Sequence, residues 1–230
     1  MTAATDPGAD LAATEFLDHT APEVASFVAR AAPDPDASPV ERTVALYYAV
    51  RDGIRYEVYG ADLSRQGLRA SQVLRTGSGM CLHKSVVYAA ALRACGIPSR
   101  LVLTDVRNHL SSPRLRELVG GDVFRFHCLT SVYVGQKWLR ATPVFNRALC
   151  RLYKIAPLEF DGSGDSLYHP WDRQGRRHME FLHTHGEFPD LPYDLVITGL
   201  RDAHPRLFAG VDRFASGSLV SDHPDARMQP

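Results

Sequence analysis

The sequence predicts an α+β fold in which a helix opened by a cysteine packs on an antiparallel sheet. A loop at residues 77–80 contains two glycines and leads into Cys81, and good helix formers continue without a break through residues 82–94. A strand rich in Leu and Val follows at residues 99–106. Two alternating segments joined by a Gly-Gln pair then predict a β-hairpin.

The length and composition fit a single domain with loose ends. The chain has 230 residues, of which 45% are hydrophobic, and this is enough to build a sizeable core. We expect a disordered N-terminus at 1–10, one domain at 11–215 and a loose tail at 216–230. Within the domain, the core covers about 40–145, and a downstream lid or wall covers 146–200.

Charge and cysteine usage restrict the compartment and the partners. The 26 Lys and Arg residues balance the 26 Asp and Glu residues, so we expect no basic surface for nucleic acid. The sequence has no run of about 18 apolar residues that could span a membrane, and residues 1–10 lack the regions of a signal peptide. The four cysteines form no CxxC pair, which favours reduced thiols in a cytoplasm. We therefore expect a cytoplasmic protein with no nucleic-acid or membrane partner, and its oligomeric state stays open.

Helices and a short extended arm are predicted ahead of the cysteine. Cap residues, prolines and glycines set their expected ends. The expected elements are a helix over 11–32 broken at 18–20, with Thr20 capping its second part and Pro22 in the first turn; a helix that starts with Ser38, Pro39 and Glu41 and ends at Gly53; an extended arm at 54–59; and a short helix at 70–75.

Beyond the cysteine helix, which should end at Gly96 and Pro98, a hairpin and a long polar segment are predicted. The expected elements are a loop at 108–121 with a helical turn near 115–118, hairpin strands at 124–134 and 137–142 joined by a type II′ turn, a short helix at 148–152, and an ordered element at 191–200. Residues 161–193 are polar and turn-rich. They suit either a lid or wall that sets substrate choice or a plain solvated loop.

Cys81 is a candidate nucleophile because of its position. The first turn of a helix has backbone N–H groups without intrahelical partners, and their dipoles favour the thiolate, which is the reactive form of cysteine. Gly77 and Gly79 allow the loop to bend and leave room for a substrate carbonyl beside the sulfur. The alternative is an inert cysteine that is buried at a helix start as a small apolar group.

His127 is the candidate partner of this thiol. If the strands turn at 135–136, alternation places His127 and Thr142 on one face of the hairpin as diagonal neighbours, and a slip of one residue would abolish this arrangement. The other residues expected on that face are Leu129, Ser131, Tyr133, Trp138 and Arg140. The alternative is a partly buried strand histidine that is bonded to a backbone carbonyl.

Four blocks of residues carry a family resemblance. They are YYAVRDGIRYE from Tyr47 onward, Gly-Met-Cys ending at Cys81 with AALRACGIPSR at 90–100, His127 in its alternating strand, and KWLRATP at 137–143. With these blocks the chain resembles the transglutaminase-like superfamily over roughly residues 40–145. The resemblance implies a papain-like, transglutaminase-core fold.

The resemblance also implies roles for three positions. Cys81 matches the nucleophile and His127 the general base and acid. The aspartate of the family falls on Thr142, which can accept a hydrogen bond from His127 but cannot stabilise an imidazolium by charge. The third role is therefore filled from elsewhere, or the enzyme works as a dyad, or catalysis is weakened. The candidate substitutes are Asn146, Asp161 and Asp165. The sequence that follows is typical of a bacterial subgroup with the same Thr-Pro ending, which favours a working variant.

The chemistry implied by the resemblance is acyl transfer through a thioester. Cys81 would attack a carbonyl carbon, and its backbone N–H would hold the oxyanion together with Gln72 or Tyr56. The donor would be a peptide, an amide or a thioester, and the acceptor an amine or water, with no cofactor. Two alternatives stay open: a small-molecule amide synthase that uses an acyl-carrier thioester, and a non-catalytic binding module that kept the fold.

A group of downstream histidines invites a metal interpretation. Its members are His169, His178, His183 and His185, to which Cys81 and His83 could be added. Zinc sites normally combine two tightly spaced pairs of ligands, and no second pair is present here. We therefore expect these histidines to cap turns and to bind no metal.

Overall fold

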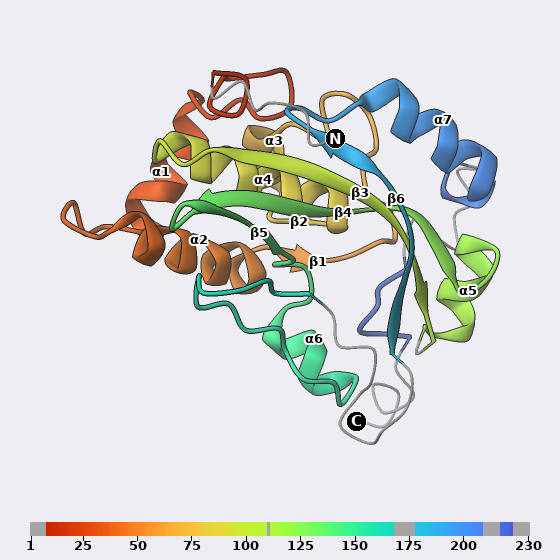
Figure 1. Cartoon of the computed structure of the whole chain (residues 1–230). Helices are drawn as coiled ribbons and strands as arrows, with labels where there is room; N and C mark the ends of the chain where they lie inside the picture. The colour runs from red at the N-terminus through yellow and green to blue at the C-terminus, as the bar shows by residue number, and fades with distance from the viewer. Residues whose placement is uncertain (1–7, 110, 168–177, 209–216, 223–230) are drawn as a thin grey trace.

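A four-stranded antiparallel sheet forms the centre of the computed structural model, which describes residues 8–109, 111–167, 178–208 and 217–222 (Figure 1). Its strand order is β5-β4-β3-β6. The strands are β3 (Ser99–Asn108), β4 (Val123–Val134), β5 (Lys137–Ala141) and β6 (Met179–Phe188). A short parallel pair, β1 (Arg55–Tyr56) and β2 (Ser78–Gly79), brings the segment after the second helix to the loop before Cys81.

The predicted cysteine helix, α4 (Cys81–Ala94), is the central helix of the fold. Its residues from Cys81 to Arg93 are all buried, because the sheet covers one side and α1 (Pro22–Ala31), α2 (Pro39–Gly53) and α3 (Ala70–Thr76) cover the rest. Ser85 Oγ donates to the Cys128 carbonyl over 2.9 Å, and Thr130 Oγ1 donates to the Ser85 carbonyl over 3.2 Å. These bonds fix the first half of α4 against β4.

The helix ends show which local signals held. Ser38 caps α2 in a capping box with Glu41, as predicted, and Gly96 is left-handed after α4. The expected helix at 11–20 is wrong, and α1 begins at Pro22 without Thr20 as its cap. The reason is tertiary, because the Asp18 carboxylate accepts from the backbone N–H of Ser71 over 3.0 Å and also from its hydroxyl.

The hairpin register is as predicted, but its turn is not. Tyr133 pairs with Trp138 and Val134 with Lys137. Gly135 and Gln136 both have positive φ angles, 58° and 63°, which makes the turn type I′ and not type II′. Both primed turns match the twist of the strands, so the change of turn type leaves the register intact.

Among the described residues, the second half of the chain holds three further α-helices and one unexpected strand. The helices are α5 (Pro113–Val119), α6 (Arg147–Leu152) and α7 (Tyr193–Ala203), and a short 3-10 helix follows at Pro205–Leu207. Residues 179–188, expected to lie in a loop or lid, form the edge strand β6 against β3. The sequence does not reveal this strand because its apolar and polar residues do not alternate. The neighbouring apolar residues Phe181 and Leu182, for example, are both exposed.

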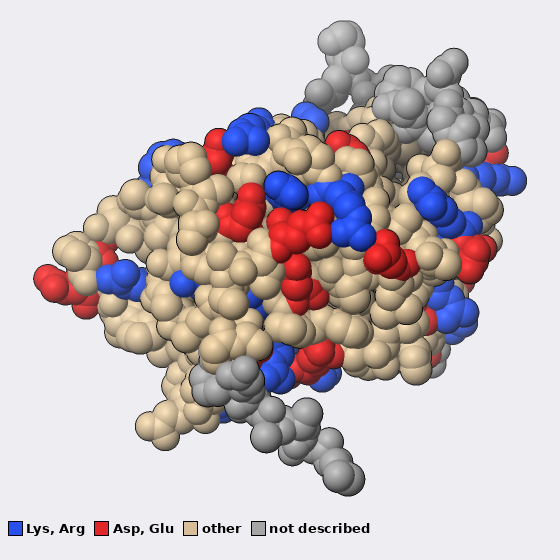
Figure 2. Space-filling model, turned by 90° about the horizontal axis from the view of Figure 1, so that it is seen from above, with Lys and Arg blue, Asp and Glu red and all other residues tan. Residues whose placement is uncertain are grey.

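Both ends of the described chain are packed more tightly than expected. Asp10, placed in a disordered N-terminus by the sequence, is 2% exposed and pairs with Arg100. Leu219, placed in a loose tail, is 4% exposed and belongs to the core. Basic and acidic side chains alternate on the face shown in Figure 2. Among the described helices, none has the length and the apolar content needed to cross a membrane.

Candidate active site

The loop before Cys81 bends as predicted, but one of its glycines serves another purpose. Gly77 is left-handed, with φ of 69°. A Cβ at Gly79 would lie 2.5 Å from the His83 side chain, so this glycine makes room for His83 and not for a substrate. His83 Nδ1 accepts from the Met80 N–H at 3.3 Å, and its Nε2 donates to the Asp62 carbonyl at 3.0 Å. The histidine therefore caps α4 and ties it to the preceding loop.

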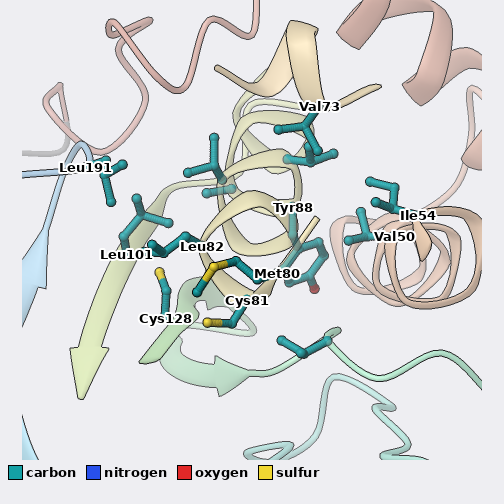
Figure 3. Close-up of a cluster of buried hydrophobic side chains, with 14 of the residues drawn as sticks. Val50, Ile54, Val73, Met80, Cys81, Leu82, Tyr88, Leu101, Cys128 and Leu191 are labelled. Carbon is teal, nitrogen blue, oxygen red and sulfur yellow. The ribbon is translucent and has the colours of Figure 1, made fainter. Parts of the chain in front are cut away.

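The Cys81 thiol lies between the first turn of α4 and strand β4. Its side chain points toward that of Cys128 (Figure 3), and the backbone N–H groups of Cys128, Leu82 and Cys81 itself face the sulfur. Burial outweighs these amides and raises the pKa of the thiol to about 11. The expectation of a thiolate at rest is therefore wrong, because the helix terminus is too dry to keep the anion.

His127 lies on β4 directly before Cys128, opposite Thr104 of β3. Its imidazole is 5% exposed, and burial lowers its pKa to about 4. At neutral pH the site thus holds a thiol and an uncharged imidazole. No hydrogen bond joins these two side chains, both of which belong to the described part of the chain. In many unliganded enzymes, such contacts tighten only when substrate binds.

Tyr56 connects the two halves of the site. Its ring is 9% exposed and packs edge-on against Phe145, with ring centres 4.8 Å apart. Tyr56 lines the same cavity as His127, and it is close enough to Cys81 that a thiolate there would add to the rise in the tyrosine pKa that burial causes. Of the two side chains predicted to hold an oxyanion, Tyr56 is therefore beside both candidate catalytic groups.

Gln72, the other predicted oxyanion donor, belongs to a surface network. Its amide oxygen accepts from Arg75 over 3.2 Å, and Arg75 forms an ion pair with Glu23 of α1. This network lies on the outer side of α3, where Arg75 and Glu23 line a shallow surface hollow. The structure does not bring Gln72 to Cys81.

Thr142 follows β5 directly and is 1% exposed. The last paired residues of the hairpin are Thr130 and Ala141, so continuing the register places Thr142 on the face of the sheet that carries His127. Tyr47 donates to the Thr142 carbonyl over 3.4 Å, whereas the Thr142 hydroxyl oxygen has no hydrogen-bond partner among the described residues. A buried hydroxyl without a partner carries a free-energy cost, so its place in this site calls for an explanation.

The other candidates for the third position have contacts of their own. Asn146 accepts from the Tyr56 N–H at 2.6 Å and donates to the Ile54 carbonyl at 2.7 Å and to the Arg51 carbonyl. Asp161 and Asp165 are exposed. Asp161 accepts from Ser163, and Asp165 accepts from the Arg140 N–H at 2.9 Å. Asn146 thus supports β1, and the two aspartates shape a surface turn.

The cavity beside His127 has a volume of about 60 Å³ and is mostly apolar. Its lining consists of Tyr56, Val106, Asn108, Ser111, Ser112, Leu115, Phe124, His127, Phe145, Leu149, Tyr153, Ile155, His178, Met179 and Leu219. The Leu219 N–H donates to both Glu57 carboxylate oxygens over 3.2–3.3 Å, and Tyr153 donates to its carbonyl over 2.9 Å. Sequence reasoning missed Leu219, because the isolated apolar pair Leu219 and Val220 in a polar tail gives no periodic signal.

The described downstream histidines lie in two places. His178 lines the cavity, while His185 donates to the Asp105 carboxylate over 2.8 Å and stacks on Phe126. His183 packs edge-on against His185. His169 lies outside the described residues, as does part of the segment that we interpreted as a lid or wall. The histidines of β6 therefore belong to the sheet edge.

The candidate catalytic residues lie within the segment of the chain that matches a known family model. A family model described as the transglutaminase-like superfamily matches residues 26–143, slightly more than half of the chain and including Cys81, His127 and Thr142. The match confirms the predicted α+β, transglutaminase-core fold. A solved structure of a candidate cysteine protease from Cytophaga hutchinsonii aligns at 15% identity with a TM-score of 0.42, covering 56% of this chain and 39% of that one. No curated protein matches the sequence.

Proposed function

Because this chain belongs to the transglutaminase-like superfamily, we propose that it is an enzyme that transfers acyl groups through a thioester on Cys81. The observation that carries the proposal is the position of the Cys81 sulfur, at the mouth of α4 and at the backbone N–H of the residue that follows His127. Tyr56 adds to it, since this residue neighbours the sulfur and lines the cavity of His127.

The neutral state of both groups suits a step in which the proton moves only when a donor is bound. Cys81 gives its proton to His127 as its sulfur bonds to the carbonyl carbon of the donor. His127 then returns the proton to the leaving group as the bond between that group and the carbonyl carbon breaks. In the second half-reaction, His127 takes a proton from an amine or from water as this acceptor bonds to the carbonyl carbon of the thioester. His127 then gives the proton to the Cys81 sulfur as the thioester bond breaks, which restores the neutral thiol and imidazole.

In each half-reaction the carbonyl oxygen of the acyl group becomes an oxyanion, and hydrogen-bond donors near the Cys81 sulfur must stabilise it. The Cys81 backbone N–H is at hand there, and the Tyr56 hydroxyl stays protonated because burial holds its pKa well above the usual value. We assign the orienting role to Thr142, whose buried hydroxyl oxygen is uncommitted among the described residues. A hydroxyl in place of a carboxylate agrees with an imidazole that is uncharged at rest.

Two other functions fit the same fold. A small-molecule amide synthase would use the same chemistry with an acyl-carrier thioester as donor and an amine as acceptor. A non-catalytic binding module would keep the core without reacting at Cys81. The site favours an enzyme, since a binding module has no need of a buried thiol at a helix start and a buried imidazole on the strand that faces it.

Alkylation of the native protein with iodoacetamide near neutral pH, followed by mapping of the adduct, tests the proposal. Of the four cysteines, all of them described, only Cys95 is partly exposed. Accessibility alone therefore predicts labelling at Cys95, while transfer of the Cys81 proton to His127 during attack on the reagent predicts faster labelling at Cys81. The His127→Gln variant should lose the Cys81 label and keep the Cys95 label. Labelling that follows exposure in both proteins would refute an activated Cys81.

A further inference from the structure

We propose that the apolar cavity beside His127 binds the acyl part of the donor and selects short, uncharged acyl groups. This inference rests on the proposed function, and it names the substrate class on which Cys81 would act. The occupant is the hydrocarbon portion of the acyl group, with its carbonyl at the sulfur. The proposal holds for peptide, amide and thioester donors alike, because only the acyl part of the donor enters the cavity.

The composition of the lining is the first argument. Apolar side chains from five separate parts of the chain form most of the wall, and none of the described lining residues is Asp, Glu, Lys or Arg. An ionised acyl group, such as a succinyl or glutamyl carboxylate, would lose its hydration there without a charged partner. An alkyl or small aromatic group would instead gain from leaving water.

The position of the cavity is the second argument. His127 and Tyr56 both line it. Tyr56 is close enough to Cys81 that a thiolate there would raise the tyrosine pKa, and His127 directly precedes Cys128, whose backbone N–H faces the sulfur. A carbonyl attacked by the sulfur would therefore have its acyl chain next to the Tyr56 and Phe145 rings.

A second cavity makes the assignment more specific. It lies on the other side of β1, where alternation turns Arg55 and Glu57 away from Tyr56, and its lining also includes Asp62 and His83. This cavity is polar and larger, about 330 Å³. Charged or polar parts of a substrate have a place there, so the small apolar cavity is left for the acyl group.

Leu219 sets the size limit. Its side chain completes the apolar wall, and its backbone is held at both ends, by Glu57 at the N–H and by Tyr153 at the carbonyl. The next anchor is Asp222, which is held by Tyr59, by Ser112 over 3.2 Å and by Arg114 over 3.2 Å. With the wall fixed in this way, a cavity of about 60 Å³ suits a short acyl group.

Single-turnover acylation with p-nitrophenyl esters tests the inference. The acetyl, butyryl, hexanoyl and succinyl esters are each mixed with the full chain, and the nitrophenolate burst and the intact mass report acylation at Cys81, with Cys81→Ala as blank. We expect the rate to rise by about tenfold per methylene until the cavity is full, and then to fall. The succinyl ester should react at least tenfold more slowly than the butyryl ester.

Two variants of α5 provide a matched pair. Leu115 lines the cavity, while Leu118 is equally buried on the same helix and does not line it. Leu115→Ala should shift the preferred ester to a longer chain, and Leu118→Ala should leave the preference unchanged. Equal rates for succinyl and butyryl esters, or the same shift in both variants, would overturn the inference while the thioester chemistry stands. If no ester acylates Cys81, the proposed function fails as well.

Discussion

Lys84 and Asn146 donate to the same two backbone carbonyls, those of Arg51 and Ile54 at the end of α2. Lys84 lies one turn into the cysteine helix and is fully buried, and Asn146 follows the hairpin. Asn146 also accepts from the Tyr56 N–H. Three separate segments are thus joined at one point, and that point sets where Tyr56 lies relative to Cys81.

We predict that Asn146→Ala lowers stability and displaces Tyr56. The change leaves the buried N–H of Tyr56 without its acceptor, while Lys84 still serves the two carbonyls, so the free energy of unfolding should fall by about 2 kcal/mol. Urea denaturation measures this loss. Asp165→Ala, at an exposed site, is the matched control and should change stability by less than about 0.5 kcal/mol. A large loss of turnover at unchanged stability would instead give Asn146 a part in the chemistry.

The acylation rate should stay constant down to unusually low pH. Burial lowers the pKa of His127 to about 4, so its base form persists through the range where an ordinary histidine becomes protonated. We expect kcat/KM to fall only as the pH drops below about 4, and to rise again only near pH 11, where the Cys81 thiol ionises. A limb near pH 6.5 would show that His127 is solvated or paired with a charge in the working enzyme.

The same burial predicts a slope in stability. Between pH 6.5 and about 4 the unfolded chain binds a proton at His127 that the folded chain does not, so the free energy of unfolding falls as the pH drops through this window. The loss attributable to His127 is about 3 kcal/mol at most. His83 and His204 share the direction of the shift, so the quantity to compare is the slope of wild type against that of His127→Gln. Identical slopes would contradict the assigned burial effect.

The Thr142 hydroxyl should contribute to rate more than to stability. Thr142→Val keeps the shape of the side chain and removes an oxygen that has no partner among the described residues, so stability should be unchanged or slightly higher. If the hydroxyl orients His127, kcat should fall by about tenfold, the worth of one hydrogen bond. Thr142→Asp should move the acid limb upward, because a nearby carboxylate favours the imidazolium. A Thr142→Val enzyme with normal turnover would assign the third role to another residue.

The parts of the fold that sequence reasoning found are those with local signals. The ends of α2 and α4 follow from Ser38, Pro39 and Gly96, and the hairpin register follows from alternation around a two-residue turn. The candidate nucleophile and its histidine came from the same signals together with the family resemblance. Each of these features depends on residues that are close in the chain.

The parts that it missed depend on contacts between distant segments. Strand β6 exists because β3 offers it an edge, and Leu219 is buried because Glu57 and Tyr153 hold its backbone. The raised thiol pKa has the same origin, because the depth at which Cys81 is buried is a property of the whole core. No spacing within the sequence reports these contacts.

Gly79 offers a test of how the loop supports the nucleophile. A Cβ at this position would lie 2.5 Å from His83, so Gly79→Ala must push away the side chain that caps α4. We expect a loss of about 2 kcal/mol in stability and slower labelling of Cys81, since its helix turn would move. The two atoms of His83 that lie 2.5 Å from this Cβ are its own Cβ and its Cγ, so His83→Gly removes the clash together with the cap. Adding Gly79→Ala to His83→Gly should therefore cost no more than a few tenths of a kcal/mol. Denaturation and labelling of the two single variants and the double variant complete the cycle. If the two losses simply add, His83 is not the reason for the glycine, and the space beside Gly79 is then available to a substrate after all.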